Sequence, residues 1–216
     1  MPSAMNRLRL RFIRGEEIKF ISHLDMVRLW QRVFRRSGIE ICYSEGYNPH
    51  PRLSIAAPLA LGVTGSNELM DVYLREPLAE TSLICMIRPQ MPVGLGIKQV
   101  FPIPLDVPTL QSQIRFAEYE AKVSIDEENS LEGRVESLLD CQCLPWEHLR
   151  DTGVKSYDLR LLINSVWIDS VVDGVAGIGM RLQCDSNGAG RPEQVIKALG
   201  LDAPLSIHRS RIILHP

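Results

Sequence analysis

The sequence predicts an α+β protein made of two tandem ferredoxin-like units, each with the element order β-α-β-β-α-β. Three observations support this prediction: strand and helix patterns in residues 1–101, a repeat of the same order in 116–216, and three prolines between them. We therefore expect a first domain at 1–101, a linker at 102–115 and a second domain at 116–216.

The first strand and the first helix have the clearest signals. Residues 7–13 alternate strictly between basic and apolar side chains, which predicts a strand. Its core face would carry Leu8, Leu10 and Phe12. Ser22 and Asp25 form an S-x-x-D start signal for a helix, and Gly38 is a natural residue just beyond its end.

That helix carries two stripes at helical spacing. The apolar stripe consists of Met26, Val27, Trp30, Val33 and Phe34. The basic stripe consists of Arg28, Arg32, Arg35 and Arg36. A basic stripe can bind phosphates through forked donors, although such a stripe is also typical of an ordinary solvated helix face.

The remaining elements follow from shorter patterns. In the first unit we expect strands at 39–43, 69–74 and 96–100, an extended stretch at 53–61 and a helix at 81–91. In strand 69–74, Met70, Val72 and Leu74 would point inward, and Asp71 and Tyr73 outward. In the second unit we expect strands at 117–125, 154–157, 175–183 and 207–214, and helices at 131–139 and from Pro192 to Gly200. Residues 159–166 fit either a short helix or a strand.

Charge is distributed unevenly along the chain. The net charge is −2, yet residues 1–52 hold ten Arg and Lys against five Asp and Glu. This favours a local basic patch and gives no reason to expect a DNA-binding protein. No apolar run is long enough to cross a membrane, and the N-terminus has no signal-peptide pattern, so we expect a cytoplasmic protein. The five cysteines fit reduced thiols there.

Three segments resemble a known family. They are residues 20–25 (FISHLD), 35–38 (RRSG) and 43–51 (YSEGYNPHP). Together they resemble the uncharacterised radical-SAM-linked family of bacterial proteins. Weaker matches continue at Pro58-Leu59 and Gly62-Val63, and in residues 190–193, 198–201 and 207–209.

The resemblance implies a radical SAM enzyme as a partner, because members of that family are fused to such proteins or encoded beside them. This chain lacks the C-x3-C-x2-C pattern that holds the iron–sulfur cluster of a radical SAM enzyme. We therefore expect the companion of the radical enzyme, with no cofactor of its own. A second resemblance, in architecture alone, is to CRISPR RNA-processing endonucleases, some of which cleave RNA with a histidine.

The candidate site residues lie mainly between residues 20 and 52. The expected ligand-binding set is Arg9, Arg11, Ser22, His23, Asp25, Arg28, Arg35, Arg36, Tyr43, Ser44, Gly46, Tyr47, Asn48, His50 and Arg52. Two prolines stiffen the loop 43–51, and a stiff loop that presents aromatic, Asn and His side chains suits recognition of RNA bases. The same loop also fits a buried connection whose side chains satisfy backbone groups.

For three of these residues the sequence allows two interpretations. His23, at the start of the helix, is either an acid/base or RNA-contacting group, or a residue that packs near a simple helix cap. Arg9 and Arg11 lie either on an open sheet face that binds RNA or in cross-strand pairs with Glu68 or Asp71. No spacing demands a metal site, even if His23, Asp25 and His50 converge.

We therefore expect an RNA-binding or substrate-presenting accessory protein that acts with a radical SAM enzyme, plausibly in RNA modification. One alternative is a metal-independent endoribonuclease that uses His23 or His50. Another is a protein-binding adaptor. The sequence does not identify the RNA, the reaction of the partner or the oligomeric state.

Overall fold

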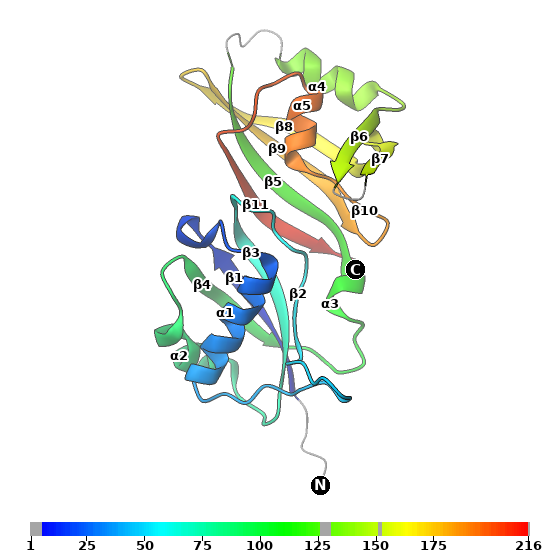
Figure 1. Ribbon diagram of the computed structural model, residues 1–216. Coiled ribbons are helices and arrows are strands. Elements are labelled where there is room, and N and C mark those ends of the chain that lie inside the picture. The colour runs from blue at the N-terminus through cyan, green and yellow to red at the C-terminus, as the bar shows by residue number, and fades with distance from the viewer. Residues whose placement is uncertain (1–5, 126–130, 151–152, 216) are drawn as a thin grey trace. The chain divides into compact units, whose positions relative to one another are not determined.

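A computed structural model describes residues 6–125, 131–150 and 153–215. The fold is mixed α+β, as expected, and the chain divides into two compact units between Ile114 and Arg115 (Figure 1). We call them unit 1 and unit 2 and describe each by itself. Within the described ranges, no helix is both long and apolar enough to span a membrane.

Unit 1 follows the order β-α-β-β-α-β. Its elements are β1 (Asn6–Arg14), α1 (His23–Arg36), β2 (Leu53–Ile55), β3 (Val63–Leu74), α2 (Glu80–Ile87), β4 (Leu95–Pro102) and the short α3 (Leu110–Gln113). Single 3-10 turns lie at Glu16–Ile18 and Arg88–Gln90. The strands are antiparallel in the order β4-β1-β3-β2.

The core of unit 1 lies between this sheet and its two helices. Leu8, Leu10 and Phe12 of β1 are at most 1% exposed, which confirms the predicted inward face. Both α1 and α2 contribute side chains to the same apolar cluster. Trp30 of α1 is fully buried, and its ring lies 5.3 Å from that of Phe12 in an edge-to-face contact, a favoured aromatic geometry.

Helix α1 begins and ends where the sequence predicts. The Ser22 hydroxyl accepts a hydrogen bond from the backbone N–H of Asp25, so Ser22 is the N-cap. Gly38 adopts φ +72°, the left-handed conformation that closes a helix and that glycine adopts without strain. These two signals fix the length of the helix and so the positions of its arginines.

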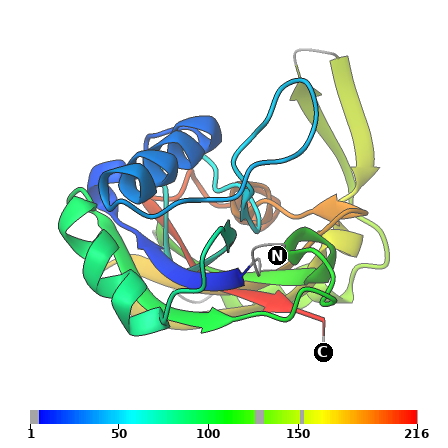
Figure 2. The same cartoon turned by 90° about the horizontal axis from the view of Figure 1, so that it is seen from below.

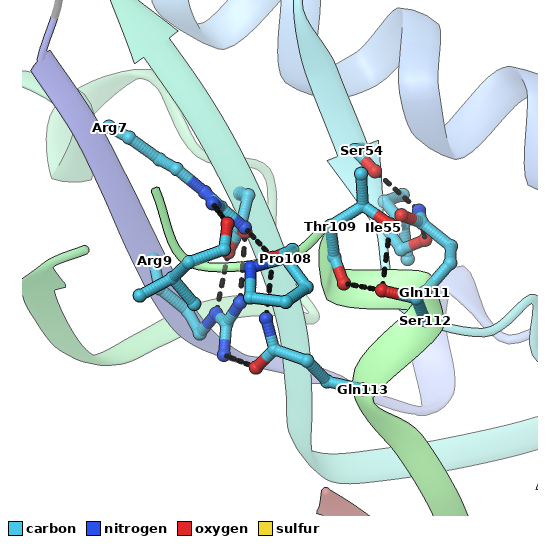
Figure 3. Close-up of polar contacts among 11 residues, drawn as sticks. Arg7, Arg9, Ser54, Ile55, Pro108, Thr109, Gln111, Ser112 and Gln113 are labelled. Carbon is cyan, nitrogen blue, oxygen red and sulfur yellow. Dashed lines mark hydrogen bonds and ion pairs between the residues drawn. The ribbon is translucent and has the colours of Figure 1, made fainter. Parts of the chain in front are cut away.

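Part of the opposite face of the unit 1 sheet, around Arg7 and Arg9, is covered by residues 107–113 (Figure 3). Asp71 of β3 is 1% exposed and accepts hydrogen bonds from Arg7 and Arg9 of β1. Arg7 also donates to the carbonyls of Val107 and Pro108. Asp71 therefore does lie on the face opposite the core, but this segment buries it. The residues expected to be a linker thus contact unit 1.

One strand prediction in unit 1 was wrong. Residues 39–43 form isolated bridges, Ile41 with Leu74 and Tyr43 with Pro51, in place of a strand. The strand β2 is instead the three-residue segment that pairs with β3 further along the chain. The result is a long loop on the side of α1, visible in light blue in Figure 2.

Unit 2 repeats the order of unit 1 with one insertion. Its elements are β5 (Ile114–Ser124), α4 (Leu131–Asp140), β6 (Pro145–Arg150), β7 (Gly153–Asp158), β8 (Ile163–Val172), β9 (Val175–Asp185), β10 (Gly188–Ala189), α5 (Pro192–Ala198) and β11 (Ser206–Leu214). Its sheet runs β8-β9-β5-β11, and β10 also pairs with β9. The hairpin β6-β7 was not anticipated in full, because only its second strand had a strand pattern.

Close packing of Trp167 against Gly179 shapes the outer face of the unit 2 sheet. These two residues are cross-strand partners in β8 and β9. The indole lies so close to Gly179 that a Cβ there would come within 2.2 Å of the ring. The indole N–H donates to Asp169 at 2.7 Å, which fixes the orientation of the ring.

Candidate functional site

A groove along α1 gathers most of the exposed basic side chains of the predicted site. Its volume is about 700 Å³, within the range of small-ligand sites. It is lined by Arg28, Gln31, Arg32, Arg35, Gly38, Ile39, Glu40, Ile41, Tyr43, Pro51 and Arg75, and we call it the basic groove. Four guanidinium groups and one carboxylate make it a cationic site for an anionic ligand.

One wall of the basic groove is the arginine row of α1. Arg28, Arg32 and Arg35 lie at positions i, i+4 and i+7, which places them on one helix face over about 10 Å. Arg28 pairs with Asp25 at 3.1 Å in an exposed contact that contributes little to stability and can open for a ligand. Arg32 and Arg35 are exposed and form no salt bridge with any described residue.

Arg36 is separated from this row. It lines a second groove of about 420 Å³ with Pro89, Met91 and Pro92, and Arg32 lines both grooves. The sequence placed Arg36 with Arg28 and Arg35 because all of them are basic. The structure brings Arg28 and Arg35 together and leaves Arg36 outside the basic groove.

The opposite wall is built from residues 38–43 and from Pro51, which lies just before β2. Tyr43 is 55% exposed and lies beside Pro51, with which it forms a backbone bridge. Ile39 and Ile41 supply a buried apolar floor. An exposed tyrosine facing arginines can stack on a planar ligand while the arginines bind its anionic part.

One end of the basic groove holds the ion pair Glu40–Arg75. Arg75 Nη1 donates to Glu40 Oε2 at 3.3 Å, and both side chains are well exposed. Neither residue was among the predicted site residues. Arg32 was not among them either, although its i+4 spacing from Arg28 was the signal that could have included it.

The loop 44–50 is closed by two hydrogen bonds between its ends. The backbone N–H of Ser44 donates to the carbonyl of His50 at 2.8 Å, and the N–H of His50 donates to the Ser44 hydroxyl at 2.9 Å. Gly46 has φ +122°, which allows the sharp turn inside the loop. Tyr47 at the tip is 99% exposed, and Asn48 is also exposed. The loop thus presents its side chains to solvent and does not line the basic groove.

Arg52 follows this loop and stacks on an aromatic ring. Its guanidinium lies 3.9 Å from the centroid of the Tyr73 ring, and that of Arg7 lies 5.6 Å from the same centroid. Cation–π contacts of this kind hold an arginine in place. Arg52 is only partly exposed and is occupied by this contact.

The start of α1 forms a separate polar cluster. The Ser22 hydroxyl donates to Asp25 Oδ2 at 2.7 Å, and this hydrogen bond, with one from Arg28, lowers the pKa of Asp25. His23 is half-buried and lines a small pocket of about 10 Å³ that also contains Glu68 and Arg14. His50 lies instead in the exposed loop, so the two histidines belong to different features of unit 1.

Arg9 is buried and does not contribute to the candidate surface. It is 3% exposed, and its Nε donates to Asp71 Oδ1 at 2.6 Å while its Nη1 donates to Gln113. The cross-strand pairing with Asp71 that the sequence left open is thus the arrangement observed. Arg11, on the same strand, is partly exposed and lies outside the basic groove.

No metal-binding cluster of three or more His, Cys, Asp or Glu side chains is present within the described ranges. All five cysteines are free thiols. A hydrogen bond with Asp158 raises the pKa of Cys143, which makes this thiol less reactive.

Comparison with protein families gives one match. The family is described as "Uncharacterized protein conserved in bacteria (DUF2344)", and its model matches residues 7–192. A search of curated proteins finds no match.

Comparison with solved structures gives distant likenesses. A chain of a Cbf5-Nop10-Gar1 complex is 10% identical with a TM-score of 0.49, over 96% of this chain and 48% of that one. A chain of the archaeal box H/ACA sRNP Nop10-Cbf5 complex is 11% identical with a TM-score of 0.47, over 96% and 48%. A putative glycine cleavage system transcriptional repressor is 12% identical with a TM-score of 0.27, over 99% and 100%. This chain spans about half the length of the first two, and likeness at this level carries no functional argument.

Proposed function

This chain belongs to the DUF2344 family of uncharacterised proteins conserved in bacteria, and from that premise we propose that it is an RNA-binding accessory protein. The basic groove would hold a single-stranded segment of RNA. The observation that supports this is that Arg28, Arg32 and Arg35 line the same groove as the exposed Tyr43.

Single-stranded RNA suits this groove better than a duplex does. Proteins bind single strands by combining a cationic path for the backbone with aromatic rings on which bases stack. The α1 row supplies the cationic path, and Tyr43 supplies one such ring. The sheet face that often binds RNA in folds of this kind is covered around Arg7 and Arg9 in unit 1 by residues 107–113.

We also propose that both units are ferredoxin-like domains. The antiparallel order β4-β1-β3-β2 in unit 1 supports this assignment. In unit 2 the corresponding order is β11-β5-β9-β8, with the hairpin β6-β7 inserted after α4. Many functions share such a fold, so the fold itself does not support the RNA proposal.

The experiment is a direct binding measurement with matched variants. A fluorescein-labelled nine-nucleotide RNA of mixed sequence is titrated with the protein at low and at moderate salt, and anisotropy is recorded. We expect binding that weakens with salt, and a large loss of affinity in the double variant Arg32→Glu, Arg35→Glu.

Arg36→Glu is the control, because Arg36 is exposed on the same helix and lines the second groove alone, whereas Arg35 of the double variant lines the basic groove alone. Each substitution to Glu changes the charge by the same amount. A general charge effect would therefore lower the affinity for RNA by the same factor for each substituted arginine in both variants. Undetectable RNA binding by the unmodified protein, or equal effects per site, would refute the proposal.

We propose further that the protein presents RNA to a radical SAM enzyme and is not itself catalytic. This partner rests on the sequence resemblance alone, since the description of the matched family mentions no such enzyme. Co-expression of the chain with radical SAM enzymes of the same genome, followed by affinity purification, tests it. Retention of one of them in a stoichiometric complex is the expected result.

A further inference from the structure

We propose that the second groove on α1, the one that Arg36 lines, docks an extended acidic–apolar–acidic segment of a partner protein, of the type Glu-Leu-Glu. This inference goes beyond the proposed function, because it assigns a protein ligand to a groove other than the basic groove. The second groove has a volume of about 420 Å³, within the range of sites that hold small ligands.

One wall of the second groove is a single stripe of α1. Leu29, Arg32, Val33 and Arg36 lie at positions i, i+3, i+4 and i+7, so they share one helix face. Val33 belongs to the apolar core and Leu29 packs against it, so these two side chains form an apolar floor. Arg32 and Arg36 form no salt bridge with any described residue. This wall thus combines an apolar floor with two guanidinium groups whose donors are available to a ligand.

The other wall is apolar and comes from the segment after α2. Pro89, Met91 and Pro92 line it, and the two prolines are exposed. Proline has no backbone N–H donor, so this wall does not present the donor row of a sheet edge and contacts a ligand mainly through side chains. Methionine adapts its shape to different apolar groups. This wall therefore fits an apolar side chain.

The charge of the second groove identifies its ligand as acidic. Among the described residues that line it, two are arginines and none is acidic. A guanidinium group binds a carboxylate through paired, charge-assisted hydrogen bonds. A groove that combines two such groups with apolar walls is complementary to a segment that carries acidic and apolar residues together.

An RNA strand fits the second groove less well than such a peptide does. Single strands bind where aromatic rings that stack on bases accompany a cationic path. The described residues that line the second groove include no Phe, Tyr, Trp or His, whereas Tyr43 lines the basic groove. Leucine, valine, methionine and proline side chains instead favour burial of an apolar amino-acid side chain.

The spacing of the two arginines matches an extended peptide. Four residues of helix separate Arg32 from Arg36 by about 6 Å along the axis of α1. Alternate residues of an extended segment lie on the same side and about 6.5 Å apart. Two glutamates in the pattern Glu-Leu-Glu can therefore face Arg32 and Arg36 while the leucine between them faces the wall of proline and methionine.

The test measures the binding of short peptides by fluorescence anisotropy at low salt. The probe is the fluorescein-labelled peptide GSELEPSG, whose proline keeps the preceding glutamate extended. Matched peptides replace both glutamates by glutamine (GSQLQPSG), the leucine by serine (GSESEPSG), or one glutamate by lysine (GSKLEPSG and GSELKPSG). We expect the probe to bind at least about tenfold more tightly than the glutamine peptide and about fivefold more tightly than the serine peptide.

Reversal of one charge locates the binding. In Arg36→Glu the affinity for the probe should fall about tenfold or more, and one of the two lysine peptides should bind this variant more tightly than the probe does. Such a gain also shows that the variant is folded. Lys98→Glu is the control, because Lys98 is exposed and lines neither groove, so its charge reversal should change the affinity for the probe by less than about twofold.

The outcomes separate this inference from the proposed function. No binding of the probe at protein concentrations up to about 1 mM overturns the inference. Equal binding of the probe and the glutamine peptide, or equal losses in Arg36→Glu and Lys98→Glu, also overturns it. RNA that displaces the probe, together with weaker RNA binding by Arg36→Glu, would assign the second groove to RNA and overturn the peptide assignment. Failure of the protein to bind RNA leaves the inference standing, because the peptide measurement contains no RNA.

Discussion

Arg9 and Asp71 form a buried ion pair across the β1–β3 ladder, with Arg9 Nε 2.6 Å from Asp71 Oδ1. Arg7 donates to the other oxygen of the same carboxylate and, with the carbonyls of Val107 and Pro108, holds residues 107–113 against the sheet. This cluster explains why the basic strand β1 does not offer its charges to a ligand. The basic groove on α1 remains available for that role.

The first prediction concerns the stability of this cluster. Asp71→Asn removes the charge that compensates two buried guanidinium groups, so we expect a loss of about 3–5 kcal/mol in the free energy of unfolding. Urea denaturation measures it. Glu16→Gln, which removes one partner of an exposed ion pair with Lys19, should cost less than about 1 kcal/mol. Similar losses in both variants would contradict the assigned burial of Asp71.

The second prediction concerns the start of α1. Because hydrogen bonds from Ser22 and Arg28 lower the pKa of Asp25 in the folded state, ionised Asp25 stabilises the fold at pH values above its ordinary pKa. That contribution is lost as the pH falls through the lowered pKa. In Ser22→Ala the pKa of Asp25 should rise toward its ordinary value, as followed by NMR titration of the carboxyl carbon. An unchanged pKa would show that Ser22 does not stabilise the carboxylate.

The third prediction concerns the packing of Trp167 on Gly179. Gly179→Ala forces the indole away from the strand, so we expect a loss of about 1–3 kcal/mol in stability and a shift in tryptophan fluorescence. Gly133→Ala in α4 is the control, because its Cβ would meet no atom within 4 Å, and it should stabilise the protein by about 0.5–1 kcal/mol. A destabilising Gly133→Ala together with a neutral Gly179→Ala would contradict this packing.

The fourth prediction concerns cleavage of RNA. His23 lines a pocket with space for about one water molecule, and His50 lies in a different, exposed loop, so the two histidines do not form one acid/base pair, and we predict no cleavage of RNA. Labelled cellular RNA incubated with the protein and a metal chelator should stay intact on a denaturing gel. Discrete fragments that vanish in His23→Ala or His50→Ala would instead establish the endoribonuclease alternative.

The sequence predicted the elements whose signals are local. The N-cap at Ser22, the glycine at position 38 and the inward face of β1 were correct because capping and periodicity act within a few residues. The prediction of a strand at 39–43 was wrong, because these residues form isolated bridges and residues 53–55 form the strand that pairs with β3. Pairing of this kind depends on contacts distant in sequence, which a local pattern does not contain.

The site was predicted in part for the same reason. Arg28, Arg35 and Tyr43 were identified from the helix stripe and the loop composition, and the structure brings them together. Glu40 and Arg75 were missed because their pairing joins residues 35 positions apart in the sequence. Arg9 was misplaced because the sequence did not show that residues 107–113 cover this part of the sheet.

The most direct test of the central claim is the location of the RNA contact. A strand with a single 4-thiouridine is cross-linked to the protein by ultraviolet light, and the modified peptide is identified by mass spectrometry. We predict that the cross-link falls on peptides that carry residues 28–35 or Tyr43, and that it is lost in Arg32→Glu, Arg35→Glu but kept in Arg36→Glu. A cross-link confined to unit 2, or one that survives in the double variant, would contradict the assignment of the basic groove as the RNA site.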